Sequence, residues 1–227
     1  TFAVPKNKWW NDRNVLLHFG AVDWDTTVWV NGKEVVKHRG GFDPFSADIT
    51  AHLKTDGDNE LLVSVFDPSD AGYQPRGKQV QNPHGIWYTP TTGIWQTVWL
   101  EPVPKTYIRG VKLTPHLEEV TYGPKGIELA PGKHYGLGVQ LDVVGDTSGL
   151  NFVFECSVAD LDLPGRPATT TQWGPMRMLA DKPEFRLTVP VNRISGERAY
   201  LWAPDFPVLH NLKLRIARGE GFFPSKF

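Results

Sequence analysis

The sequence predicts an all-β protein made of two packed sandwiches. Short runs of alternating apolar and polar residues, rich in β-branched and aromatic side chains, recur along the chain, and this period of two is typical of strands. Turn signals separate the runs, and no stretch has a helical period. A chain of 227 residues is long enough for two small domains. Pro102-Val103-Pro104 is the expected boundary, because proline cannot continue a ladder.

In the first domain, alternating or β-rich runs predict strands at residues 1–4, 15–19, 27–30, 33–38, 43–49, 60–66 and 94–101. Asn31-Gly32 predicts a hairpin with a type I′ turn, since both central residues of that turn need φ > 0. The run from Ile94 to Glu101 has apolar residues on both faces, so we expect both faces to pack. The polar stretch 67–90 predicts a loop longer than the roughly 12–15 residues at which structureless loops become uncommon.

The second domain is predicted to be a sandwich of short strands at residues 107–115, 137–144, 152–158, 176–179, 185–191 and 212–216. Residues 118–133 are rich in turn signals. The predicted domains are therefore 1–104 and 105–218. The tail, 219–227, has no interpretable pattern and is left unassigned.

Composition excludes several classes of function. There are 24 basic and 25 acidic residues, so charge gives no reason to expect nucleic acid or an anionic membrane as a partner. No apolar run reaches the roughly 20 residues that span a bilayer, and no signal peptide is visible. Cys156 is the single cysteine, so an internal disulfide is excluded. No Cys/His cluster has metal-ligand spacing, and we expect no metal site and no cofactor.

Four stretches resemble glycoside hydrolase family 2, which includes β-galactosidases, β-glucuronidases and β-mannosidases. Residues 93–101 look like the last strand of the family's N-terminal sugar-binding domain, and two more stretches, 19–33 and 40–50, also fit that domain. A fourth stretch, Leu201 to Asp205, resembles the close of the family's second domain. The resemblance implies a jelly-roll, galactose-binding-like sandwich without its first strands, followed by an immunoglobulin-like sandwich.

The resemblance also bears on catalysis. A retaining glycosidase needs two carboxylates about 5–5.5 Å apart. In family 2 both glutamates lie on a (β/α)₈ barrel that follows these two domains, and a barrel needs roughly 250 further residues. We therefore expect no catalytic residue in this chain, which is interpreted as a fragment or truncated product, inactive alone. The implied partners are carbohydrate and the barrel, and the family implies a periplasmic or secreted location.

The candidate site is the long loop. It combines planar amides, cations and aromatics, which suit sugar hydroxyl pairs and the apolar face of a sugar ring. Two interpretations stay open: direct sugar contact, or contact with the barrel, which is slightly favoured because polar loop residues more often hold structure. A free-standing carbohydrate-binding module that uses the loop or exposed tryptophans, and a packing scaffold, are the competing functions. The candidate residues are Asp70, Tyr73, Arg76, Lys78, Gln79, Asn82, Trp87 and Tyr88.

Overall fold

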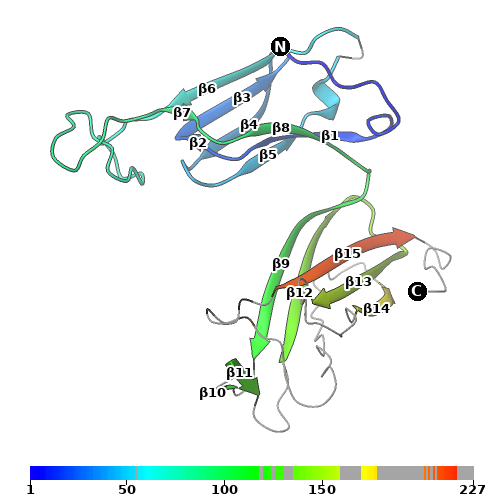
Figure 1. Cartoon of the computed structure of the whole chain (residues 1–227). Coiled ribbons are helices and arrows are strands. Elements are labelled where there is room, and N and C mark those ends of the chain that lie inside the picture. The colour runs from blue at the N-terminus through cyan, green and yellow to red at the C-terminus, as the bar shows by residue number, and fades with distance from the viewer. Residues whose placement is uncertain are drawn as a thin grey trace. The chain divides into compact units, whose positions relative to one another are not determined.

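The computed structural model describes residues 1–54, 56–117, 120–123, 126–129, 135–158, 170–177, 202, 204, 207 and 209–218. The chain divides into two compact units, Thr1–Lys105 and Thr106–Phe227, each of which is described by itself. The described residues form strands and loops with a single 3₁₀ turn, η1 (Thr50–His52) (Figure 1). The predicted all-β class is confirmed.

The first unit is a jelly-roll sandwich of antiparallel sheets. One sheet has the order β5-β1-β8, formed by Phe45–Asp48, Asn14–Phe19 and Val98–Val103. The other has the order β4-β3-β6, formed by Lys33–Arg39, Asp25–Val30 and Leu61–Phe66. A short ladder joins β2 (Val22–Asp23) to β7 (Gly93–Ile94). Alternate residues of β1 and β3, together with Val22 of β2 and with Ile49 after β5, form one apolar core, whose buried members are Val15, Leu17, Phe19, Val22, Val28, Val30 and Ile49.

The predicted hairpin at Asn31-Gly32 is confirmed. Its two central residues have φ values of 50° and 76°, and Val30 pairs with Lys33 across the turn. The side chain of Asn31 adds contacts that the turn does not require. Its Nδ2 donates to the carbonyl of His52 (2.7 Å) and to Oδ1 of Asn59 (2.8 Å), and its Oδ1 accepts from the Glu60 N–H (2.9 Å). This one side chain therefore ties the hairpin to the segment around the buried Asn59, which is 1% exposed.

The predicted strand 94–101 is wrong in two respects. It is broken, because β7 ends at Ile94 and β8 begins at Val98, with the N–H groups of Trp95 and Gln96 both directed at the Ala21 carbonyl (3.4 Å each). Only one face packs: Val98 and Leu100 contact the core, whereas Trp95 and Trp99 are 52% and 43% exposed. The physical reason is that the outer face of this sheet borders solvent, so apolar residues on both faces of a run do not prove that both are buried.

Two strand ends also differ from prediction. β8 continues through Pro102 to Val103, with Pro102 opposite Val15. An edge strand tolerates proline because the missing N–H would point away from its single partner. At the N-terminus, the expected strand 1–4 is reduced to a single bridge between Phe2 and Asn59.

The second unit also packs two sheets over one core. β9 (Tyr107–Leu117) pairs with β12 (Tyr135–Val144), and the second sheet has the order β14-β13-β15, formed by Thr170–Arg177, Leu150–Val158 and His210–Arg218. The buried Val139, Leu141 and Leu150 are covered by apolar residues of β9, β12 and β15, as expected for an immunoglobulin-like sandwich.

Two details of the second unit depart from the predicted strands. The turn-rich stretch contains two short antiparallel strands, β10 (Val120–Gly123) and β11 (Gly126–Leu129), in which Tyr122 pairs with Ile127. The strand expected at 176–179 begins earlier and ends at Arg177. The expected strand 185–191, the tail 219–227 and most of the fourth family motif lie outside the described residues.

Candidate functional site

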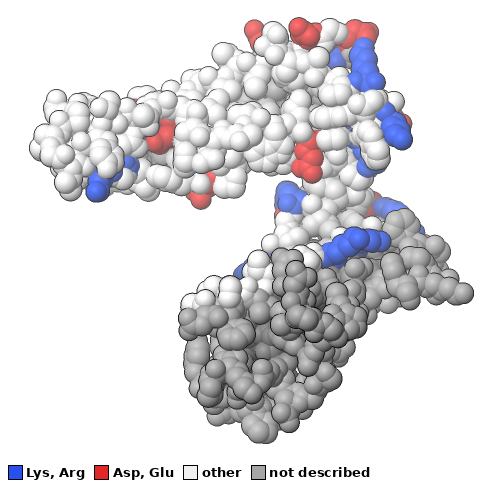
Figure 2. Space-filling view, viewed as in Figure 1, with Lys and Arg blue, Asp and Glu red and all other residues white. Residues whose placement is uncertain are grey.

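The predicted long loop is present and extends from one end of the first unit. It leaves β6 after Phe66 and enters β7 at Gly93. In Figure 1 it projects beyond the ends of both sheets, on the side where β2, β6 and β7 lie. On the face shown in Figure 2 this end carries few charged side chains. Uncharged groups therefore make up most of this face of the loop.

A clasp in the middle of the loop fixes its shape. Tyr88 donates its N–H to the Lys78 carbonyl (2.7 Å), and Val80 donates to the Tyr88 carbonyl (3.0 Å). Gln79 lies between these bonds, and its Oε1 accepts from both the N–H (2.6 Å) and the hydroxyl (3.0 Å) of Thr91. The loop is therefore held by its own backbone and by one amide side chain, which limits its conformational freedom.

The predicted cations and aromatics pair with each other inside the loop. The Arg76 guanidinium lies 6.0 Å from the centre of the Trp87 ring and donates to the Asp70 carbonyl (3.1 Å). Lys78 lies 5.9 Å from the Tyr88 ring. Such cation–π contacts are worth about 0.5–1 kcal/mol at exposed sites. Six of the eight predicted residues thus hold the loop together.

The other two predicted residues project from this framework. Tyr73 is fully exposed and Asn82 is exposed. Neither side chain has a hydrogen bond or ring contact within the part of the chain that the structure describes. These two side chains are therefore not used to hold the described part of the loop together.

Sequence reasoning missed Gln74, which supports the first half of the loop. Its side chain is 9% exposed, and its Nε2 donates to the Ser69 carbonyl (2.8 Å). A Cβ on Gly72 would come within 2.2 Å of the Gln74 Oε1, so a larger residue at 72 would displace this amide. No pattern in the sequence distinguishes this glutamine from the others.

The two ends of the loop are joined at Asp67. Its Oδ1 accepts from the Ser69 N–H (2.7 Å) and its Oδ2 accepts from the Thr92 hydroxyl (3.0 Å). A second carboxyl nearby, Asp23 on β2, is 9% exposed. Burial raises the pKa of Asp23, and the negative charge of Asp67 raises it further. Sequence reasoning also missed Asp23, although an acid inside the apolar run Ala21-Val22-Asp23-Trp24 was an available signal.

Around Asp23 the packing is close. A Cβ on Gly41 would lie 2.6 Å from the Asp23 Oδ1, so the carboxyl occupies the space that a side chain would need. The Gly41 carbonyl accepts from the Trp95 indole N–H (2.7 Å), and Phe42 meets Trp95 edge-on at 5.9 Å. The loop therefore starts from a rigid base.

Replacing Asp23 by asparagine is expected to stabilise the first unit at pH 7. The folded-state pKa of Asp23 is raised above the ordinary value of 3.8, so ionised Asp23 opposes folding above that range. The advantage of the amide variant should shrink as the pH falls through the raised pKa and vanish below about 3.8, where aspartic acid is neutral in both states. Urea midpoints of Asp23→Asn and the parent chain, measured from pH 3 to 8, test this; a lower midpoint for the variant at pH 7 would contradict it.

In the described ranges, no three His, Cys, Asp or Glu side chains come together to hold a metal ion. Nor does any helix among those residues have the length and apolar character to cross a membrane. The arrangement provides a loop held by its own hydrogen bonds and cation–π contacts, with the side chains of Tyr73 and Asn82 exposed at its surface.

The comparison with protein families identifies the first unit. Residues 1–104 match the family model described as "Glycosyl hydrolases family 2, sugar binding domain". This jelly-roll unit therefore belongs to the sugar-binding domains of glycosyl hydrolase family 2. The resemblance drawn from the sequence motifs is confirmed.

Relatives and solved structures extend the similarity along the chain. A β-galactosidase of Thermoanaerobacter pseudethanolicus is 26% identical over 90% of this chain and 24% of its own length. A β-glucuronidase of Mus musculus is 29% identical over 61% of this chain and 24% of its own length. The crystal structure of a Bacteroides uniformis β-glucuronidase matches with a TM-score of 0.59 at 19% identity, covering 95% of this chain and 23% of that one. The chain thus spans about a quarter of the length of these proteins, and the structural likeness shows the fold.

Proposed function

We propose that this chain is the non-catalytic, two-sandwich portion of a family 2 glycoside hydrolase of carbohydrate metabolism. In this proposal it supports a sugar pocket on a separate (β/α)₈ barrel and is inactive alone. One observation carries the proposal: alignment with a β-galactosidase covers 90% of this chain and only 24% of that enzyme. About three quarters of that relative lies outside the alignment, and a barrel of roughly 250 residues would fit within that remainder.

The loop is the part that would serve the pocket. Because Arg76, Gln79 and Trp87 hold its shape, they would act as positioning residues. Tyr73 and Asn82 would make the outward contacts, either with sugar or with the barrel, since their side chains are exposed. Binding sites commonly use such loops on rigid scaffolds.

A free-standing carbohydrate-binding module is the second candidate. The exposed tryptophans favour it: Trp99 is 43% exposed and stacks on His18 at 4.8 Å, and Trp95 is 52% exposed. A ring held from one side can receive the apolar face of a sugar on the other. Specific retention of the chain on a neutral glycan panel would favour this candidate.

The proposal predicts no glycoside turnover by the isolated chain. The purified 227-residue chain is assayed with aryl β-galactoside, β-glucuronide and β-mannoside, beside the longer protein that carries the barrel. We expect background hydrolysis from the chain and saturable hydrolysis from the longer protein. Turnover by the chain that stays proportional to its concentration through successive purification steps would overturn the proposal.

A further inference from the structure

The hairpin turn between β3 and β4 contains a chemically reactive pair, Asn31-Gly32, and the sequence has no other Asn-Gly pair. Where glycine follows asparagine, no side chain shields the peptide nitrogen, so this nitrogen can approach the asparagine Cγ closely. A Cβ built on Gly32 would meet no atom within 4 Å. The surroundings of Gly32 therefore place no steric obstacle in the way of deamidation of Asn31.

Deamidation replaces the side-chain amide by a carboxylate and consumes only water. The Gly32 nitrogen gives up its proton to the solvent and bonds to Cγ of Asn31. The Cγ–Nδ2 bond breaks, and the leaving NH₂ group takes a proton from the solvent and departs as ammonia. Water then opens the five-membered imide at either of its carbonyls, which gives aspartate or isoaspartate at this position.

In the folded chain the Asn31 amide is bound at both ends to groups other than Gly32. Its Nδ2 donates to the His52 carbonyl and to the Asn59 Oδ1, and its Oδ1 accepts from the Glu60 N–H. The Asn31 N–H also donates to the Glu60 carbonyl (3.0 Å). Closing the imide ring rotates the amide toward the Gly32 nitrogen and breaks the three side-chain bonds, so the folded state protects Asn31.

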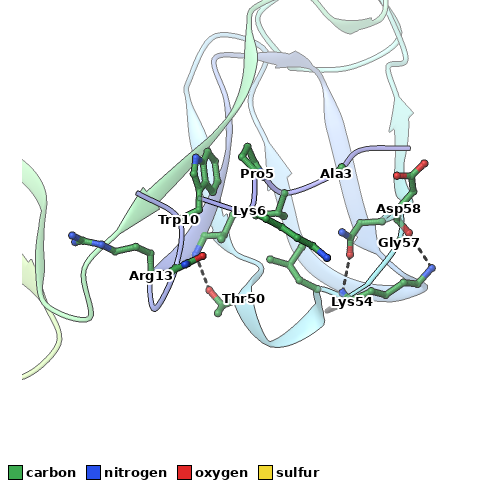
Figure 3. Close-up of a pocket in the computed structure, with 14 residues that line it drawn as sticks. Ala3, Pro5, Lys6, Trp10, Arg13, Thr50, Lys54, Gly57 and Asp58 are labelled. Atoms are coloured by element: carbon green, nitrogen blue, oxygen red, sulfur yellow. Dashed lines mark hydrogen bonds between the residues drawn. The ribbon is translucent and has the colours of Figure 1, made fainter. Parts of the chain in front are cut away.

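The segment that receives these bonds accommodates an amide and opposes a carboxylate. The Lys54 N–H donates to the Asn59 Oδ1 (2.9 Å), and the Lys54 Nζ donates to the Asp58 carbonyl (3.3 Å), as the dashed lines at Lys54 in Figure 3 show. Turning the Asn59 amide over would place its NH₂ group against the Lys54 N–H, a donor against a donor. The His52 carbonyl can only accept. A carboxylate at position 31 would therefore direct an oxygen at two acceptors.

We propose that Asn31 is a deamidation site that the folded first unit keeps closed and that becomes reactive when the hairpin separates from the segment around Asn59. The product cannot restore the network, because an ionised carboxylate has no hydrogen to donate. Deamidation therefore converts a reversible local opening into a lasting loss of stability. The site involves neither a sugar nor the long loop, so its success or failure is independent of the proposed function.

The first test compares the rate of deamidation in the folded and the unfolded chain. The full chain is incubated at neutral pH in buffer and in guanidinium chloride, and peptide mapping by mass spectrometry follows the conversion of Asn31. A synthetic peptide of residues 28–36, incubated in both solvents, corrects for the effect of the solvent itself. We expect conversion to be about tenfold slower or more in the folded chain, because three hydrogen bonds at the low end of their usual net contribution give about that factor. Equal corrected rates would overturn the proposal.

The second test measures the effect of the product on stability. Asn31→Asp reproduces the aspartate product, and we expect it to lower the urea midpoint of the first unit or to prevent folding. Asn82→Asp makes the same chemical change at an exposed asparagine and should leave the midpoint unchanged. An Asn31→Asp midpoint equal to that of the parent chain would overturn the proposal. The rate comparison needs only the parent chain, so it decides independently even where the variant does not fold.

Discussion

Replacing Asn31 by alanine is expected to lower the free energy of unfolding of the first unit by about 3 kcal/mol. Alanine at φ 50° costs about 1 kcal/mol. The substitution also removes three hydrogen bonds, while the Oδ1 of Asn59, which is 1% exposed, keeps the bond from the Lys54 N–H (2.9 Å). A hydrogen bond contributes about 0.5–1.5 kcal/mol net, so the three lost bonds together contribute more than the turn.

Asn31→Gly separates the two contributions. Glycine accepts φ > 0 freely but loses the same three bonds, so we expect it to be about 1 kcal/mol less destabilising than alanine. Asn82→Ala is the matched control, because Asn82 is exposed and should leave the urea midpoint unchanged. Urea unfolding followed by tryptophan fluorescence measures all three variants. A midpoint for Asn31→Ala equal to that of the parent chain would show that the network adds nothing.

The hairpin shows which features can be predicted from neighbouring residues in the sequence and which cannot. Asn31-Gly32 was predictable because the backbone of a type I′ turn dictates the residue types. The bonds from Asn31 to His52 and Asn59 were not predictable, because they join residues 21 and 28 positions apart and depend on the folded arrangement. The turn could thus be predicted from neighbouring residues alone. Most of the stabilisation expected from Asn31 instead comes from its tertiary hydrogen bonds.

The last strand of the first unit shows a case in which the sequence pattern predicted burial wrongly. An alternating run with apolar residues on both faces predicts a doubly packed strand, yet Trp95 and Trp99 are exposed and the run breaks before Val98. Periodicity reports which residues share a face, and it does not report what covers that face. Whether a face of β8 is covered depends on the neighbouring sheets and segments of the fold, and the local sequence does not contain that information.

For the candidate site, length and composition correctly located the loop. They could not assign roles within it. Gln79 acts as a clasp on Thr91, whereas Tyr73 is fully exposed, although both are polar residues of the same loop. Asp23 lies 44 positions from Asp67, and only the fold brings these two carboxyls together.

The second large effect is expected from the loop in the longer protein that carries the barrel. Replacing residues 70–88 by a short glycine linker should lower kcat/KM by about 100-fold or more, because a displacement of about 1 Å at a reacting centre can cost that much. Gln79→Ala should give a smaller loss by releasing the bonds to Thr91. Neither change touches the buried core of the first unit, so both variants should fold.

The most direct test of the account is kcat/KM of this loop replacement in the longer protein, measured beside the urea midpoint of its first unit. Lys37→Gln, on β4 outside the loop, serves as the surface control. The account predicts a fall in kcat/KM of about 100-fold or more in a variant whose midpoint matches that of the parent. A folded variant with wild-type kcat/KM and normal association of its domains would show that the loop is only a spacer and would contradict the account.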